Sequence, residues 1–376
     1  MIFIYSFISL IVLHYVLFII SAKRGILKIK NSAGITEELR KVTVIIPFRN
    51  EEDIITENVR GINNIDYPLE YLEVIYVNDN STDDSENCIK QNITHQNYRI
   101  INSIEGSNGR GFKKLAIEQA INVSEGEIIV LTDADCFVPP AWISTVVSYF
   151  DDETAMVSGP VTFEQQNNFF EKIQKLEFAG LNLMGAGLIG IGNPTICSSA
   201  NLAFKKSVFL EIGGYRDNLN LSSGDDELLM QKIFNNTSHK IKFCFKKSAL
   251  VFTRANRSLE EFTNQRIRWA SKGLFYKNSS LVFKLVLIFL FYFNMILLPF
   301  VSFMIGIELL WFLLLSVCCK FVVEYLVIRE GKEFYFDSSL MKLFLPAQIF
   351  QIPYIAYAAV AGVFGGFKWK GRNLKR

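Results

Sequence analysis

The stretch Ile128–Cys136 reads IIVLTDADC, an apolar run that delivers two carboxylates into a turn closed by Pro139 and Pro140. The run predicts a buried β-strand. Residues two apart on an extended chain point the same way, so Asp133 and Asp135 are expected side by side, where they need a cation. A hard divalent ion held by one or two carboxylates usually completes its shell with substrate phosphates. The stretch therefore indicates a nucleotide-diphosphate site, with an acidic turn after a buried strand as the alternative.

The composition points to membrane segments joined to a domain of ordinary polarity. Half of the 376 residues are hydrophobic, and they concentrate in residues 1–20, 281–328 and 343–366. The formal net charge of +2 gives no indication of nucleic-acid binding. The six cysteines form no CxxC pair and are accompanied by three histidines, so neither a zinc site nor a disulfide framework follows. Reduced thiols fit a cytoplasmic location.

Residues 1–22 are predicted to form an amino-terminal transmembrane anchor. The apolar run is long enough to cross roughly 30 Å of hydrocarbon. Four basic residues follow directly: Lys23, Arg24, Lys28 and Lys30. Basic residues favour the cytoplasmic side, so the amino terminus is expected outside and the following chain inside. A cleaved signal peptide, the alternative, would carry basic residues before its apolar run.

Residues 281–367 are predicted to form a carboxy-terminal membrane region. Leu281–Phe303 and Leu309–Ile328 are typical of a hairpin of two spanning helices. Lys320 and Glu324 lie four residues apart and can pair on one helix face. We expect these two residues to extend toward the cytoplasmic interface rather than to act as a relay.

The segment Leu343–Gly366 is harder to interpret. Pro346 and Pro353 remove helical hydrogen bonds, which predicts a broken third helix or a re-entrant segment. The basic tail, residues 368–376, is expected in the cytoplasm. A single further crossing would place it outside, and the sequence leaves both arrangements open.

Residues 40–280 show strands alternating with helical stretches, which is typical of an α/β domain. Strands are predicted at Val42–Ile46 (ended by Pro47), Leu72–Val77, Ile128–Thr132 and Ala155–Val161. Helices are predicted at Ile54–Ile62, Lys113–Val123 and Phe169–Leu188. Polar loops follow the first three strands, with the sequences RNEED, NDNSTDD and DADC. Ligands of open parallel sheets bind outside these strand ends, so the candidate site is expected there.

Seven motifs occur in order between Val42 and Trp269. They are VTVIIPFRNEED (Val42–Asp53), VNDNSTDDS (Val77–Ser85), GFKKLAIEQAI (Gly111–Ile121), LTDADC (Leu131–Cys136), SSANLAFKKSVFLEIGGY (Ser198–Tyr215), SGDDELL (Ser223–Leu229) and QRIRW (Gln265–Trp269). Together they resemble the family-2 glycosyltransferases. The anchor, the carboxy-terminal helices and the QxxRW motif narrow the resemblance to the membrane-bound, cellulose-synthase-like branch. The resemblance implies inverting enzymes with a GT-A fold, which is Rossmann-like with a mostly parallel sheet and flanking helices.

The resemblance also implies a binding site for a nucleotide-diphosphate sugar. Asp79 matches the position whose carboxylate accepts from the N–H groups of the base. Glu51 matches a position near the base, and Pro47 belongs to the same donor-binding motif. A turn-forming role for Asp79 within NDNSTDD is the alternative.

The phosphate side of this site is implied by three further matches. Lys113 aligns with the lysine near the nucleotide phosphates, where a cation helps to hold a diphosphate. Lys114 or Arg110 is the alternative contact. Asp135 matches the metal ligand for Mg²⁺ or Mn²⁺, and Asp133 matches a position that also reaches the metal, the ribose or a bound water.

The catalytic base is expected in the pair Asp225-Asp226. The acceptor hydroxyl must lose a proton as it attacks, and a positioned carboxylate can take it. By resemblance Asp226 is this base, and Asp225, which replaces a more usual glutamate, is assigned to acceptor binding. The pair also suits a helix amino terminus, and both roles can hold together.

The motif residues Gln265, Arg268 and Trp269 share one helical face by their i, i+3, i+4 spacing. The resemblance implies that Arg268 contacts the donor diphosphate and that Gln265 and Trp269 meet the acceptor. An interfacial belt of Arg and Trp is the alternative. Ser199 departs from the resemblance, since many relatives have glycine before Ala-Asn.

The sequence therefore predicts an integral, multi-pass membrane protein with a cytoplasmic catalytic domain. It is expected to move a sugar from a UDP- or GDP-sugar to a lipid-linked or glycan acceptor. With three or four membrane segments, we favour single transfer over a processive polysaccharide synthase. A non-catalytic nucleotide-sugar-binding scaffold is the alternative from another class.

Overall fold

The computed structural model describes residues 2–30, 38–104, 112–164, 166–219, 221, 224–273, 275–369 and 372–374. The chain packs as two compact units. The first consists of residues 1–26, 165–187 and 255–376, and the second of residues 27–164 and 188–254. The predicted boundaries at residues 22, 40 and 280 stay predictions.

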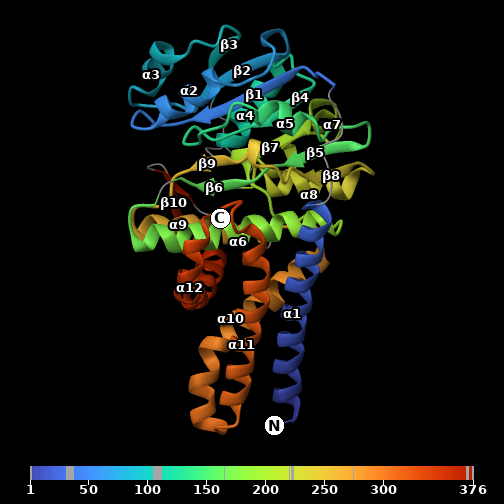
Figure 1. Ribbon diagram of the computed structural model, residues 1–376, viewed down its shortest axis with the longest axis vertical. Coiled ribbons are helices and arrows are strands. Elements are labelled where there is room, and N and C mark those ends of the chain that lie inside the picture. Colours follow the sequence, from blue (N-terminus) through green and yellow to red (C-terminus); the bar gives the residue numbers. More distant parts are fainter. Residues whose placement is uncertain are drawn as a thin grey trace. The chain divides into compact units, whose positions relative to one another are not determined.

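The second unit is built on a seven-stranded sheet with the order β3-β2-β1-β4-β7-β5-β8 (Figure 1). The strands are β1 (Val42–Phe48), β2 (Leu72–Asn78), β3 (Tyr98–Asn102), β4 (Ile128–Leu131), β5 (Thr154–Ser158), β7 (Leu202–Lys205) and β8 (Lys240–Phe243). Strands β1 to β4 pair in parallel, and β7 runs antiparallel to β4 and β5. A separate parallel pair joins β6 (Val161–Phe163) to β9 (Val251–Thr253).

Helices flank this sheet, as Figure 1 shows. They are α2 (Ile55–Asn63), α3 (Ser85–Asn92), α4 (Phe112–Val123), α5 (Trp142–Val147), α7 (Lys206–Glu211) and α8 (Glu227–Asn236). Helix α4 packs on β1 and β2 with an apolar face that includes Ala116, Ile117 and Ile121. Strands β1, β2 and β4 are almost fully buried, which explains their near-continuous apolar sequences. The predicted fold class, a mostly parallel α/β sheet with flanking helices plus long apolar helices, is confirmed.

Strand β1 continues past Pro47, where the sequence predicted its end. Pairing of β1 with β4 stops at Ile45, opposite Leu131. The Ile45 carbonyl accepts from the Thr132 N–H, which follows β4, and the Phe48 carbonyl accepts from the Asp79 N–H, which follows β2. Alternate residues of β1 therefore direct their backbone polar groups toward different neighbouring strands. The missing N–H of Pro47 faces the side where β4 has already ended, and it removes no ladder hydrogen bond.

The single strand predicted at Ala155–Val161 is wrong, because the chain divides it between β5 and β6. The break falls at Gly159–Pro160. The side chain of Asn201 donates to the Pro160 carbonyl at 2.9 Å, and a Cβ on Gly159 would lie 2.2 Å from that same side chain. Proline lacks the N–H that a continuous strand needs, so the chain leaves one sheet and joins another.

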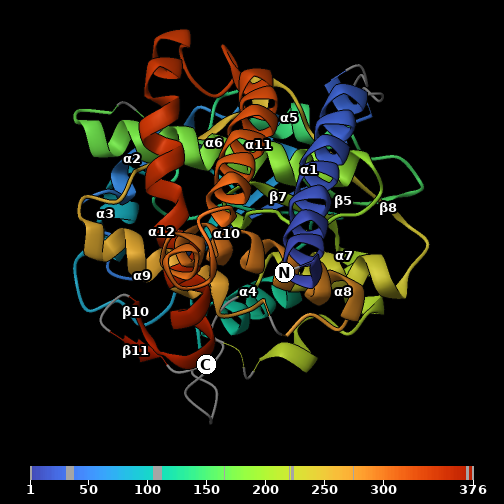
Figure 2. The ribbon, with the colours of Figure 1, turned by 90° about the horizontal axis from the view of Figure 1, so that it is seen from below.

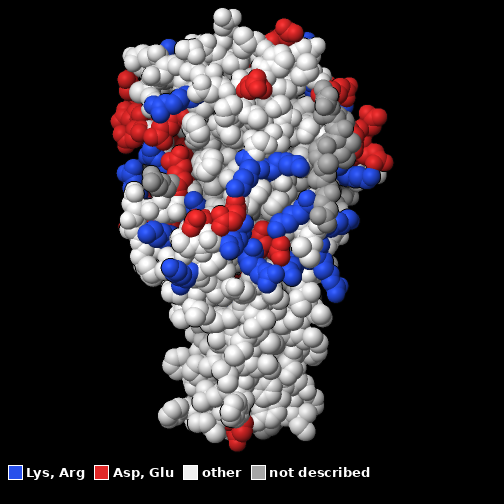
Figure 3. Space-filling model, viewed as in Figure 1, with Lys and Arg blue, Asp and Glu red and all other residues white. Residues whose placement is uncertain are grey.

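The first unit contains the long apolar helices. Its elements are α1 (Ile2–Lys30), α6 (Phe169–Gly190, mostly within this unit), α9 (Leu259–Ala270), α10 (Ser279–Ile305), α11 (Leu309–Ile328), α12 (Phe344–Phe364), β10 (Phe367–Trp369) and β11 (Arg372–Leu374). Among the described residues, four helical stretches are long and apolar enough to cross a membrane: Ile2–Lys30, Ser279–Ile305, Leu309–Gly331 and Ser338–Phe364. Figures 1 and 2 both show α1 alongside α10 and α11. Their surface in Figure 3 carries almost no Lys, Arg, Asp or Glu.

Lys320 and Glu324 pair as their spacing predicted, with Nζ and Oε1 2.9 Å apart. The expectation that they extend toward the interface is wrong, since the side chain of Lys320 is fully buried. Tyr15 of α1 and Tyr292 of α10 donate to Glu324, and Gln348 and Gln351 of α12 accept from Lys320. The pair therefore lies at the meeting point of four helices.

Helix α12 is continuous, so the broken helix predicted at Leu343–Gly366 is wrong. Pro346 lies in the first turn, where backbone N–H groups have no helical partner in any case. Pro353 lies inside the helix and is accommodated there. The side chains of the basic tail, residues 368–376, lie outside the described residues.

Candidate active site

The carboxyl ends of β1, β2 and β4 meet at one edge of the sheet. Phe48 stands opposite Asn78, and Ile45 opposite Leu131. The loops that follow are tied together by backbone hydrogen bonds, since the Asp79 N–H donates to the Phe48 carbonyl at 2.9 Å. The polar loops therefore lie at one edge, where parallel sheets bind ligands.

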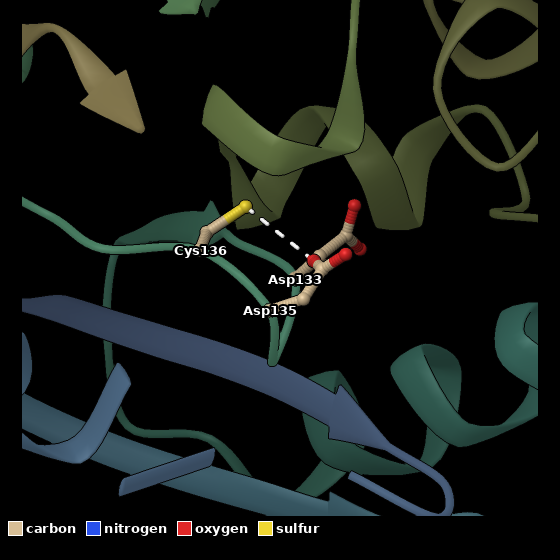
Figure 4. Close-up of side chains that lie close together, drawn as sticks. All are labelled: Asp133, Asp135 and Cys136. Carbon is tan, nitrogen blue, oxygen red and sulfur yellow. Dashed lines mark hydrogen bonds between the residues drawn. The ribbon is translucent and has the colours of Figure 1, made fainter. Parts of the chain in front are cut away.

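The sequence predicted that Asp133 and Asp135 lie on extended chain. In the structure they lie on a turn. The Cys136 N–H donates back to the Asp133 carbonyl at 3.1 Å. Asn58 of α2 fixes this turn by donating to the carbonyls of Asp133 (3.2 Å) and Cys136 (2.8 Å). The turn still brings both carboxylates together, as Figure 4 shows.

The donor atoms of Asp133, Asp135 and Cys136 lie within 4.8 Å of one another (Figure 4). Burial raises the pKa of the Cys136 thiol, and the charges of Asp135 and Asp133 raise it further. A thiol is a soft ligand, which hard cations such as Mg²⁺ and Mn²⁺ disfavour. Both aspartates are partly exposed, so a hard divalent cation fits the two carboxylates.

Lys113, the second residue of α4, joins this turn to a distant loop. Its Nζ lies 2.5 Å from Asp133 Oδ1, 3.0 Å from Asp225 Oδ2 and 2.8 Å from Ser199 Oγ. The contacts with Asp133 and Ser199 are hydrogen bonds, and the contact with Asp225 is an ion pair. Lys113 therefore bridges two carboxylates that are 92 residues apart in the chain (225 − 133).

The electrostatics of this bridge follow from its charges. Burial acts to lower the pKa of Lys113, but its interactions with Asp133 and Asp225 outweigh burial and raise the pKa. Burial acts to raise the pKa of Asp225, and Lys113, assisted by Lys114, outweighs it and holds the pKa below its usual range. The cluster is therefore ionised at neutral pH, with Asp225 as carboxylate and Lys113 as ammonium.

Lys114 was the alternative phosphate contact. Its side chain is buried, and its Nζ donates to the Leu221 carbonyl at 3.1 Å. This geometry favours Lys113, the less buried of the two, as the cation of the motif that contacts the acidic turn. Arg110, the other alternative, lies outside the described residues.

The predicted nucleoside-binding residues follow β1 and β2. Pro47 is partly exposed near the end of β1, and Glu51 donates its backbone N–H to Ser85 Oγ at 2.7 Å. Asp79 is buried, and Ser103 Oγ lies 3.5 Å from its Oδ1. The side chain that closes the local turn is Asn78, whose Oδ1 accepts from the Ser81 N–H at 2.8 Å. Asn78, the residue before Asp79, thus has a turn-forming role.

The Asp225-Asp226 pair precedes α8 and follows Gly224, whose φ of +86° is costly for other residues. Tyr215 holds the loop by donating its hydroxyl to the Asp225 carbonyl at 2.9 Å. Asp226 is the N-cap of α8, and its Oδ1 accepts from the Glu227 N–H at 2.7 Å. The predicted capping role is present, at the residue that directly follows Asp225 of the Lys113 bridge.

Gln265, Arg268 and Trp269 all lie on α9, in the first unit. Their approach to the cluster of the second unit stays a prediction. Within the first unit, Gln265 Oε1 accepts from Asn256 at 3.0 Å, and Trp269 stacks on Phe178.

Arg266, which lies inside the same motif, was not predicted as a functional residue. Its guanidinium packs 4.4 Å from the ring centroid of Phe262 and 4.3 Å from that of Trp269. It also pairs with buried Glu177 of α6, which accepts from the Tyr354 hydroxyl of α12 at 2.5 Å. A buried Arg in a charged motif gives no local signal, because its partners come from elements distant in the sequence.

The second unit is therefore an α/β domain of mostly parallel strands, with an acidic turn and a lysine bridge at the carboxyl edge of its sheet. Residues 43–213 match the family model described as "Glycosyl transferase family 2". The probable glycosyltransferase YdaM of Bacillus subtilis is 26% identical over 240 residues, covering 62% of this chain and 55% of the relative. The match and its relatives support a family-2 glycosyltransferase.

Two further comparisons bear on relatives and fold. A β-monoglucosyldiacylglycerol synthase of Synechocystis is 30% identical over 142 residues, covering 37% of this chain and 29% of the relative. The chain thus spans about half the length of the first relative and under a third of the second. A mannosyltransferase of Pyrobaculum calidifontis, solved in complex with GDP-Man and Mn²⁺, superposes with a TM-score of 0.59 at 18% identity, covering 95% of this chain and 99% of that one. This likeness shows a shared fold.

Proposed function

We propose that this chain is a membrane-bound inverting glycosyltransferase. It moves a sugar from a nucleotide-diphosphate sugar to a lipid-linked or glycan acceptor at the cytoplasmic face of the membrane. The observation that carries the proposal is the bridge of Lys113 between Asp133 and Asp225, at the carboxyl edge of the sheet. This bridge gathers the predicted donor, metal and catalytic motifs in one unit.

The donor is a UDP- or GDP-sugar, with Asp79, Glu51 and Pro47 on the nucleoside side. Lys113 and Arg268 supply cations for the diphosphate. The structural relative solved with GDP-Man and Mn²⁺ supports this ligand class, although its likeness is one of fold.

Asp135 and Asp133 would hold Mg²⁺ or Mn²⁺. The bound ion supplies positive charge to the diphosphate as it leaves the sugar. Their paired oxygen ligands suit such ions, whereas the soft sulfur of Cys136 does not.

Asp226 acts as general base. The acceptor hydroxyl oxygen attacks the anomeric carbon, its proton passes to Asp226, and the diphosphate leaves with the electrons of the broken bond. Attack from the face opposite the leaving group inverts the anomeric centre. Gln265, Trp269 and Asp225 are assigned to the acceptor side.

The membrane location rests on four long apolar helices and on the basic residues at the end of α1. A membrane location suits an acceptor that is lipid-linked, and the lipid named by the Synechocystis relative is in keeping with it. We favour one transfer per acceptor over processive synthesis because four spans offer little room for a polysaccharide channel.

The test uses the purified full chain in detergent with radiolabelled UDP- and GDP-sugars, Mn²⁺ and a bacterial lipid extract. We expect one donor to give a labelled lipid of discrete mobility with an inverted anomeric centre. A ladder of products would indicate the processive synthase. Binding of nucleotide without transfer to any lipid or glycan acceptor would favour the scaffold and contradict the proposal.

A further inference from the structure

Lys113 has three oxygen partners within its own unit. Two of them are carboxylates, and one of these, Asp133, is also a proposed metal ligand. The third acceptor, Ser199 Oγ, stands where the family resemblance predicts glycine. Lys113 therefore binds the carboxylate of Asp133, which the metal ion of the donor complex is also expected to bind.

A lysine ammonium and a divalent ion on the same carboxylate repel each other, and the repulsion is strong where solvent is limited. The side chains of Lys113, Asp133 and Asp225 are 19%, 32% and 10% exposed, so screening by water is partial. The phosphate oxygens of a donor would offer Lys113 equally good acceptors. Lys113 thus has two alternative sets of partners, the carboxylates of Asp133 and Asp225 or the phosphate oxygens of a donor.

We propose that Lys113 is a built-in counter-cation. It holds Asp133 and Asp225 together while the site is empty, competes with the divalent ion for Asp133, and transfers to the diphosphate when the donor binds. Ser199 is the positioning residue that retains Lys113 in the carboxylate-bound position. This inference rests on the proposed function, since it assumes that the site takes a metal and a nucleotide diphosphate.

Ser199 is well placed for this role because its backbone is fixed on both sides. Ser198 accepts from the Ala200 N–H at 3.3 Å, and Asn201 donates to the carbonyls of Pro160 and Ala249. Ser199 itself is buried. A Ser199→Ala substitution therefore removes one acceptor of Lys113 with little change in the backbone.

The test measures Mn²⁺ binding to the full chain in detergent by electron paramagnetic resonance of free Mn²⁺, with no nucleotide or acceptor present. Lys113→Met removes the competing cation and should tighten Mn²⁺ binding by about tenfold. Ser199→Ala only weakens the competitor and should tighten binding by about threefold. Lys242→Met is the control, because Lys242 also pairs with an aspartate but lies on the edge strand β8.

A second titration adds UDP and GDP in the presence of saturating Mn²⁺. Lys113→Met should bind the preferred nucleotide more weakly than the unsubstituted chain, because the diphosphate loses its cation. Opposite changes for Mn²⁺ and for nucleotide are the signature of a shared lysine. A merely structural role for Lys113 would weaken both.

The outcomes separate this inference from the proposed function. Unchanged, weaker or absent Mn²⁺ binding in Lys113→Met and Ser199→Ala overturns the counter-cation role, even if nucleotides bind. Tighter Mn²⁺ binding, with no UDP or GDP bound by any variant, supports competition at Asp133 but contradicts the transferase.

Discussion

Two lysines in this protein each have three oxygen acceptors, yet their surroundings differ. Lys113 faces two carboxylates and one hydroxyl, and its side chain is 19% exposed. Lys320 faces one carboxylate and two glutamine amides, and its side chain is fully buried. The first group carries a formal charge of −1 (one cation, two anions), and the second is neutral.

The difference suggests that the partners of Lys113 can be exchanged for a ligand, whereas the partners of Lys320 are permanent. The Lys320–Glu324 pair is closed, because the hydroxyls of Tyr15 and Tyr292 also bind Glu324 and join four helices. Buried charges are tolerated only when paired and hydrogen-bonded. The Lys113 cluster is partly exposed, and its two carboxylates outnumber the one lysine that contacts them directly. We interpret the first as a structural joint and the second as a ligand site.

The largest expected effect follows from neutralising the proposed base. Asp226→Asn should lower the rate of sugar transfer by about 10³-fold, the usual contribution of a general base. Asparagine is as good an N-cap as aspartate, so α8 should keep its start. Transfer is measured with the donor found in the screen, and folding by thermal unfolding in detergent. A rate within tenfold of the unsubstituted chain would remove Asp226 from catalysis.

The next effect concerns stability and tests the closed joint. Lys320→Met leaves Glu324 without its cation among apolar helices and should cost about 3–5 kcal/mol. The double variant Lys320→Met with Glu324→Leu should cost less, since it removes both charges. Lys332→Met changes an exposed lysine of the same unit and is the control.

The free energies of unfolding of these variants in detergent complete a double-mutant cycle. Additive losses from the two single substitutions would show that the charges do not interact. The interpretation of the Lys320–Glu324 pair as a structural joint, and with it the comparison with the Lys113 cluster, would then be wrong.

A smaller effect is expected at His95, a buried residue outside both lysine groups. Burial lowers its pKa, and a backbone contact with Asn97 opposes this less strongly. His95 therefore binds a proton more readily in the unfolded chain than in the folded chain. The free energy of unfolding falls as the pH drops below about 6.5. His95→Leu should make the loss between pH 7 and pH 5 shallower, by on the order of 1 kcal/mol or less. Parallel pH profiles of the melting temperature would contradict this assignment.

Local sequence patterns were sufficient for most of the fold. The β-branched runs of β1, β2 and β4 and the length of the apolar helices define those elements without tertiary information. The patterns failed where a distant residue decides the outcome. Asn201 donates to the Pro160 carbonyl where the strand expected at Ala155–Val161 divides, and the partners of the Lys320–Glu324 pair come from three other helices.

The candidate site shows the same limit. The motifs single out Asp133 and Lys113, and the structure brings these two side chains into contact. The bridge itself could not be predicted from the sequence. Ser199 and Asp225 are distant from Lys113 in the chain and contact it only in the folded structure. Ser199 was noted only as a departure, and Asn58, which fixes the acidic turn, looks like an ordinary helical residue.

The most direct test of the account is calorimetric titration of UDP and GDP into the full chain, with Mn²⁺ or with EDTA. The same titration uses Asp133→Asn with Asp135→Asn, and exposed Asp152→Asn as the control. The account predicts binding of one nucleotide that requires Mn²⁺, persists in Asp152→Asn and is lost in the double variant. Equal binding in EDTA and in the double variant would contradict a metal-assisted diphosphate site at this turn.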